Sequence, residues 1–177
     1  METTKNKLSH YNSVFFTNLG NYLDTPMYFF GSIQRHDYFP KSSDIDVDIF
    51  TDNENSTISK MQHFLHKEKY QFKKFVYRLE KSKKLVHGYK VSYKEEANHL
   101  NVEFSIYNEK YKDLVLHEHR RKMDLPFYIS FLLVILKYFY YDFAILPKPI
   151  YYKIKQFLMN ICIDGKNTEF VVIDLLD

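Results

Sequence analysis

Cysteine is almost missing from this chain, which has only one, Cys162, among its 177 residues. A single thiol excludes an internal disulfide framework and any zinc site built from several cysteines. The chain also lacks a leader in which a basic start precedes an apolar run and a small-residue cleavage site, so we expect an intracellular, cytoplasmic protein. Internal repeats and long linkers are missing as well. We therefore expect one domain, or one domain with a small helical annex.

Neither sign of charge dominates the sequence, which has 25 Lys and Arg against 22 Asp and Glu and a formal net charge of +3. This mild basicity is compatible with nucleotide or nucleic-acid partners but does not demonstrate them. Apolar residues make up 45% of the chain, which is ample for a hydrophobic core.

The longest apolar segment is PFYISFLLVILKYFYYDFAIL, residues 126–146. Its length approaches that of a transmembrane helix, but Lys137 and Asp142 lie within it, and charges near a bilayer centre are costly. We expect instead a core helix packed on a sheet, and no membrane partner. A second helix with apolar periodicity is expected from Pro149 to Cys162.

Hydrophobic periodicity places further helices and strands along the chain. Apolar residues three and four positions apart predict helices over residues 7–24 and 53–70. Residues 72–80, 85–93 and 99–107 are expected to form a meander that extends a sheet begun by earlier strands. A closing strand or terminal packing segment is expected over residues 170–176.

The most informative stretch is MYFFGSIQRHDYFPKSSDIDVDIF, residues 27–50. It predicts a strand, a Gly-Ser turn, a polar loop and a second strand with Asp44, Asp46 and Asp48 on one face, because strand residues alternate faces. Carboxylates two positions apart lie roughly 6.6 Å apart at Cα, so their oxygens can converge on one or two divalent ions. A charged strand edge that discourages aggregation would explain the alternation equally well, but not the Gly-Ser turn.

Gly31-Ser32, then Arg35, then Ser43-Asp44-Ile45-Asp46 form a pattern that resembles the DNA polymerase beta-like nucleotidyltransferase superfamily. The resemblance covers residues 27–50 and, more loosely, the chain up to residue 106. His36 departs from it, since compact members usually carry Gly there. The resemblance implies an α+β fold, in which a mixed sheet has flanking helices and a small C-terminal helical part. It also implies a catalytic core over residues 1–125 and an annex over 126–177 packed on it.

The family places a third carboxylate on a later strand, and the best candidate here is Glu103. Apolar residues flank this acid in HLNVEFSIY, and a buried acid needs a partner such as a metal ion. Alternatively, Glu103 lies on the solvent face with Asn101 and Ser105. The resemblance implies a two-metal-ion mechanism, in which Asp44, Asp46 and Glu103 are the catalytic ligands of two Mg²⁺ ions, with Mn²⁺ as an alternative.

The resemblance also implies a binding site for the phosphates of ATP or another nucleoside triphosphate. Gly31 and Ser32 would position the phosphates, and Arg35 or Lys137 would neutralise their charge. Lys137-Tyr138 and Leu146-Pro147 are similar to segments of poly(A) polymerase and terminal uridylyltransferase-like enzymes. Lys148-Pro149 departs from that pattern, so no base-binding residue is carried over. Lys137 could equally be a residue of a core helix whose amine reaches out to solvent.

Other polar residues near these motifs are predicted either to support the site or to be exposed to solvent. Asp48 is expected to support the metal ligands or to lie at a solvated edge. The segment HEHRRK, residues 117–122, predicts a solvated helix or loop, since its two histidines lack the spacing of a zinc-binding helix. A phosphate-binding role for Arg120 and Arg121 remains open.

Together these features predict a Mg²⁺-dependent nucleotidyltransferase. Such an enzyme moves a nucleoside monophosphate from a nucleoside triphosphate to an acceptor hydroxyl and releases pyrophosphate. The acceptor could be an RNA 3′ end, a protein or a small molecule. The alternative is a catalytically inert module that keeps the fold for binding.

Overall fold

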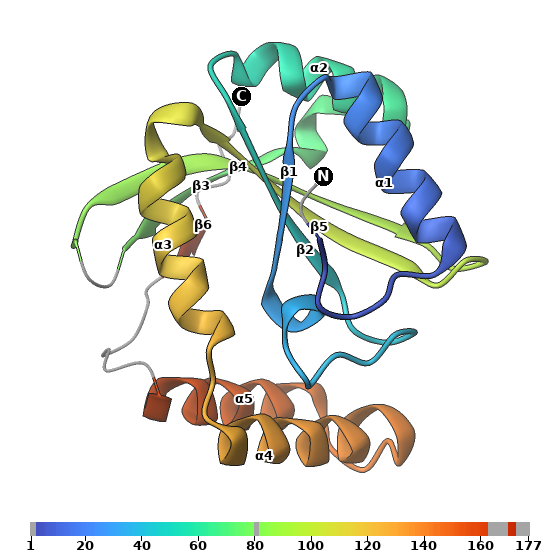
Figure 1. The fold of residues 1–177 in the computed structure, drawn as a ribbon, viewed down its shortest axis with the longest axis vertical. Coiled ribbons are helices and arrows are strands. Elements are labelled where there is room, and N and C mark those ends of the chain that lie inside the picture. The colour runs from blue at the N-terminus through green and yellow to red at the C-terminus, as the bar shows by residue number, and fades with distance from the viewer. Residues whose placement is uncertain (1–2, 80–81, 163–169, 173–177) are drawn as a thin grey trace.

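The computed structural model describes residues 3–79, 82–162 and 170–172. Its centre is a six-stranded sheet in the order β1-β2-β5-β4-β3-β6. Helices α1 and α2 cover one face, α3 lies on the other, and α4 and α5 lie side by side at one end (Figure 1). The strands are β1 Met27–Phe30, β2 Ile45–Thr51, β3 Lys73–Arg78, β4 Leu85–Glu95, β5 Leu100–Asn108 and β6 Phe170–Val172. The helices are α1 His10–Leu23, α2 Glu54–Leu65, α3 Lys112–Met123, α4 Phe127–Lys137 and α5 Lys148–Cys162.

The sheet is mixed, which confirms the predicted α+β fold with flanking helices. Strands β2 and β5 pair in parallel, whereas β1 with β2, β5 with β4, β4 with β3 and β3 with β6 pair antiparallel. The meander predicted for residues 72–107 is therefore correct. Residues 170–172 of the predicted closing strand pair with β3, and the rest of that prediction lies outside the described residues.

The main core lies between the sheet and helices α1 and α2. Each helix begins at a side-chain cap, because Ser9 accepts a hydrogen bond from the Asn12 amide and Asn53 accepts one from the Ser56 amide. Alternate residues of the strands point into this layer and are almost completely buried. The sheet contributes Met27, Phe29, Ile45, Val47, Ile49, Val91, Leu100, Val102, Phe104 and Ile106.

Helix α3 packs on the opposite face of the sheet, where it covers a smaller core with Phe50, Phe75 and Tyr107. Residues 117–122 were expected to form a solvated helix or loop. They are helical, and His117 and Arg120 are exposed, but the expectation is wrong for Glu118 and His119, which are buried. Val115 and His119 are buried, since they lie one turn apart on the side that faces the sheet.

The long apolar segment was predicted to form one helix packed on the sheet, and this prediction is wrong. It forms α4, which packs mainly on α5 and shares a third core with it, followed by a π-helical turn over Tyr138–Asp142. Many large side chains of these two helices are exposed, among them Phe127, Phe131, Ile154 and Phe157. The predicted division into a core over residues 1–125 and an annex over 126–177 stays a prediction.

A membrane-spanning helix was not expected, and none of the described helices is by itself long and apolar enough to cross a bilayer. Residues 109–123 and 127–142 meet the same test of length and composition only as a pair, with a bend of 81° between them.

Candidate functional site

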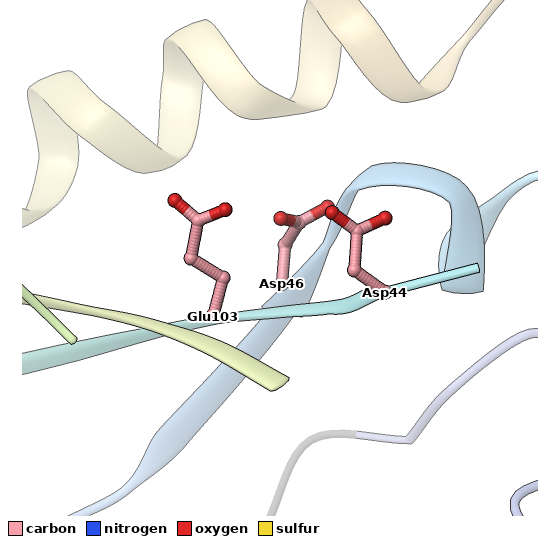
Figure 2. A group of neighbouring side chains, drawn as sticks. All are labelled: Asp44, Asp46 and Glu103. Carbon is pink, nitrogen blue, oxygen red and sulfur yellow. The ribbon is translucent and has the colours of Figure 1, made fainter. Parts of the chain in front are cut away.

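Three carboxylates come together where β2 and β5 lie side by side. Asp44 directly precedes β2, Asp46 lies within it, and Glu103 of β5 pairs with Asp46 in the parallel register. One oxygen of each side chain lies within 4.8 Å of the others. Figure 2 shows the three side chains rising from the same side of the sheet. An oxygen-rich cluster of this kind suits a hard divalent cation such as Mg²⁺.

The carboxylates line a cavity of about 390 Å³ on the face of the sheet that bears α3. Helix α3 contributes His119 and Lys122 to its wall, α5 contributes Lys155 and Met159, and β1 contributes Phe30. Helix α5 therefore helps to enclose the site, although it follows the acidic strands by many residues.

The electrostatics of the cluster favour a bound cation. Burial, together with the negative charges of Asp44 and Glu103, raises the pKa of Asp46 to about 8. Three carboxylates this close repel one another when all are ionised, so one of them keeps a proton unless a cation replaces it.

Gly31 lies against Asp46, and its place in the turn requires glycine. Its φ is +70°, and a Cβ at this position would collide with Oδ2 of Asp46. The next residue, Ser32, is buried and lines the cavity. Its hydroxyl has no hydrogen-bond partner among the described residues, so it is available to a ligand in the cavity.

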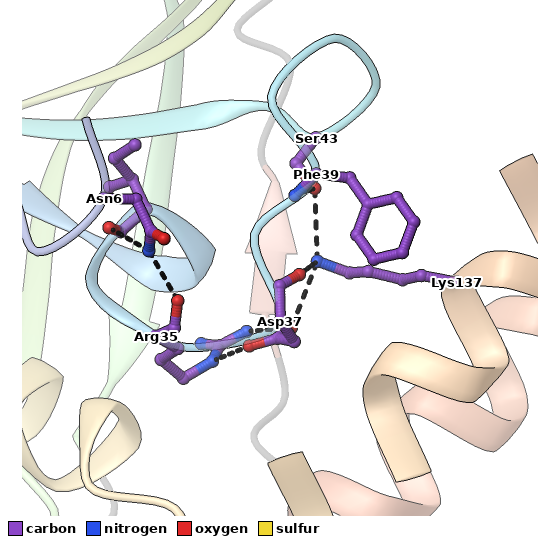
Figure 3. A network of polar contacts seen from close by, with 7 residues as sticks. Asn6, Arg35, Asp37, Phe39, Ser43 and Lys137 are labelled. Atoms are coloured by element: carbon purple, nitrogen blue, oxygen red, sulfur yellow. Dashed lines mark hydrogen bonds and ion pairs between the residues drawn. The ribbon is translucent and has the colours of Figure 1, made fainter. Parts of the chain in front are cut away.

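A fully buried carboxylate, Asp37, binds both cations that were expected to contact the triphosphate (Figure 3). Arg35 makes a two-point contact with it, with Nε 2.7 Å from Oδ1 and the second nitrogen 3.1 Å from Oδ2. Lys137 lies 3.0 Å from Oδ2 and also donates to the backbone oxygen of Asp37 and to Oγ of Ser43. Burial opposes ionisation of Asp37, but Arg35 and Lys137 outweigh it and hold its pKa below the usual value.

Arg35 and Lys137 therefore differ in their relation to the cavity. Arg35 is among the residues that line it, whereas Lys137 is not. Both bind Asp37 in the loop between Ser32 and Asp44, to which Arg35 itself belongs, and Lys137 also binds Ser43 there. Both cations therefore hold this loop. Asp37 itself was not singled out from the sequence.

Asp48, the third acid of β2, is buried rather than at a solvated edge, so that part of the prediction is wrong. Nδ1 of His119 lies 2.7 Å from its Oδ2, and the His119 ring stacks on Phe30 with a centroid distance of 4.0 Å. Burial raises the pKa of Asp48, and the neighbouring His119 partly counters this effect. The contact joins α3 to the strand that carries the metal-ligand candidates.

Three lysines that line the cavity were missed in the sequence. Lys90 of β4 forms an ion pair with Glu103, and Nζ of Lys122 donates a hydrogen bond to the Tyr77 hydroxyl at 2.7 Å. The positive charge of Lys155 partly offsets the rise in the pKa of Asp46. The elements that carry these lysines are far apart in the chain, so their convergence cannot be read from local sequence. Only Lys90 lies in a recognisable local pattern, in which it alternates with Ser92 and Lys94 as polar residues of a strand. Arg120 and Arg121 are not among the described residues that line the cavity.

Residues 17–122, more than half of the chain, match the model of the nucleotidyltransferase domain family. This chain is a nucleotidyltransferase-family protein. The match confirms the resemblance to the DNA polymerase beta-like superfamily. No curated protein and no solved structure matches the chain.

The nucleotidyltransferase domain accounts for part of the site only. Its matched range contains the three carboxylates, the Gly-Ser turn and Lys122. Lys137 and Lys155 lie outside that range, in the C-terminal helices. Membership implies a nucleoside triphosphate as substrate, and nucleotidyltransferases usually need a divalent metal ion, which the carboxylate cluster could hold.

Proposed function

We propose that this protein transfers a nucleoside monophosphate from a nucleoside triphosphate to an acceptor hydroxyl in a Mg²⁺-dependent reaction. The observation that carries the proposal is the convergence of Asp44, Asp46 and Glu103 within 4.8 Å, in a cavity beside Gly31 and Ser32. These three carboxylates would hold Mg²⁺, and Mn²⁺ as an alternative. The bound ion would lower the pKa of the acceptor hydroxyl and neutralise charge on the departing pyrophosphate.

The remaining chemistry falls to the protein's own residues. The acceptor oxygen bonds to the α-phosphorus as the bond from that phosphorus to the bridging oxygen breaks, and the electron pair leaves with pyrophosphate. Glu103 would accept the hydroxyl proton, a role supported by its position in the lining of the cavity. Gly31 allows close approach of the substrate to Asp46.

The triphosphate is best placed near Ser32 and Lys155. The Ser32 hydroxyl has no hydrogen-bond partner in the described structure, and Lys155 brings a positive charge to the same cavity. Arg35 and Lys137, which the resemblance assigned to the phosphates, would act indirectly by holding the loop through Asp37. Preorganised charges of this kind stabilise charge that develops on the leaving group.

The test is Mg²⁺-dependent release of pyrophosphate from each of the four nucleoside triphosphates, with labelled product as a second readout. Asp46→Asn should abolish turnover, because it removes a metal ligand, while the melting temperature stays near that of the wild type. Asp52→Asn, an exposed acid just after β2, is the matched control and should keep full activity. Turnover retained in Asp46→Asn would contradict the catalytic assignment.

A catalytically inert binding module is the second candidate. It is favoured by the ion pair between Lys90 and Glu103, which gives one carboxylate of the cluster a protein partner. Calorimetry separates the two functions. An enzyme binds nucleotide with Mg²⁺ and turns it over, whereas nucleotide binding without turnover of any triphosphate would support the inert module.

A further inference from the structure

A second cavity lies beside the carboxylate cavity on the same face of the sheet. Its volume is about 400 Å³, and its walls come from the turn before β3, from β3 and from β4. The lining residues are Tyr70, Gln71, Lys73, Phe75, Lys90 and Ser92. Lys90 lines both cavities, so the two are contiguous across this side chain.

The strand register places the second cavity directly next to the candidate metal site. Ser92 pairs with Glu103 across β4 and β5, and Lys73 pairs with Lys90 across β3 and β4. Paired residues point to the same face, and neighbouring strands lie about 4.8 Å apart. The Ser92 side of the second cavity therefore lies one strand, about 4.8 Å, from Glu103, and its Lys73 side lies two strands away, along a path over Lys90 and Ser92.

The lining of this cavity suits an anionic ligand with a flat ring. Tyr70 is 77% exposed, so its ring offers an open stacking surface. Lys73 and Lys90 supply positive charge, although Lys90 is also paired with Glu103 of the carboxylate cavity. No acidic residue is among the described residues that line the second cavity. Aromatic rings that stack on bases and cations that follow a phosphate backbone are the features of sites for single-stranded nucleic acid.

We infer that the second cavity binds a single-stranded oligonucleotide acceptor, with a base on Tyr70 and backbone phosphates at Lys73 and Lys90. The terminal hydroxyl of the bound strand then enters the carboxylate cavity past Lys90. This inference rests on the proposed function, since it assigns the acceptor of that reaction. A positively charged small molecule is disfavoured as acceptor by the same lysines.

The experiment measures binding of a 5′-labelled, ten-nucleotide single strand by fluorescence anisotropy, in EDTA and without triphosphate. RNA and DNA of the same sequence form two arms, which show whether the ribose 2′-hydroxyl is read. Tyr70→Ala should weaken binding about tenfold or more, because one stacked base is lost. Lys73→Gln should weaken it as well and reduce the slope of log affinity against log salt by about one.

Two matched controls separate this site from general effects. Lys74→Gln removes the neighbouring lysine on the opposite face of β3, and Tyr128→Ala removes an exposed ring on α4. Both should bind the strand as the wild type does. Wild-type affinity in Tyr70→Ala and Lys73→Gln would overturn the inference, as would equal losses in the controls or no binding to the wild type.

The binding assay needs neither metal nor turnover, so its outcome is independent of the catalytic test. Strand binding that depends on Tyr70 and Lys73 in a protein without turnover would support the site and contradict the proposed enzyme. Pyrophosphate release without any strand binding would support the proposed enzyme and contradict the oligonucleotide site.

Discussion

The two faces of the central sheet are built from the same strands but have different roles. On one face, Ile45 and Val47 of β2 and Phe104 of β5 are at most 1% exposed under α1 and α2. On the other face, Asp46 and Glu103 alternate with these residues and line a cavity. The comparison shows how a β-strand can anchor a core and present a reactive group within two residues.

The faces also differ in what burial does to them. Burial of the apolar face stabilises the fold, by about 1.5–3 kcal/mol for each large side chain. Burial on the polar face raises the pKa of Asp46 and Asp48 and so opposes their ionisation. Three predictions test this division of roles, from the largest expected effect to the smallest.

Phe104→Ala should destabilise the protein by about 3–5 kcal/mol, because it leaves a cavity in the fully buried core. The free energy of unfolding in urea measures the effect. Asn101→Ala, on the polar face of the same strand, should change it by less than about 0.5 kcal/mol. Equal losses in the two variants would show that the polar residue Asn101 stabilises the fold as much as the buried Phe104 does.

Gly31→Ala should lower kcat/KM roughly 100-fold, since a Cβ at this residue collides with Asp46 and displaces a metal-ligand candidate. Steady-state kinetics with Mg²⁺ measure the loss. Gly20→Ala is the control on the core side, where the new Cβ would meet only the flexible end of Met27 at 3.3 Å. It should keep full activity and gain stability, by up to about 1 kcal/mol, from helix propensity. Normal activity in Gly31→Ala would contradict the assigned geometry.

Without metal, stability should fall as pH rises from about 4 to 8. The native protein keeps the proton on Asp46, whose pKa is raised to about 8, whereas the unfolded chain releases it near pH 4. The loss should be on the order of 1–3 kcal/mol. Urea unfolding between pH 5 and 8 in EDTA measures it.

Asp46→Asn should flatten this dependence, because the asparagine does not titrate. Added Mg²⁺ should stabilise the wild type more at pH 8 than at pH 5, since the proton on Asp46, whose pKa is about 8, competes less with the cation at the higher pH. A pH profile that is the same in the wild type and in Asp46→Asn would show that another group is responsible.

The local pattern was sufficient to predict most of the sheet, and together with the family resemblance it predicted the acidic cluster. Strand alternation placed Asp44 and Asp46 on one face, and the apolar neighbours of Glu103 marked it as an acid on a buried strand. Both signals act over a few residues, so they can be read in the sequence. The prediction of a single long helix over residues 126–146 was wrong. The segment instead packs against α5 and contains a π-helical turn, and these features depend on tertiary contacts.

The sequence by itself determined which residues could bind a metal ion, through residue type and alternation within β2 and β5. Only the tertiary structure decided which positively charged side chains line the cavity. Lys137 lies 100 residues after Asp37 and binds it, while Lys155 lines the cavity instead. Pairs so distant in the chain meet only when helices and sheet pack together, and no local periodicity encodes that contact.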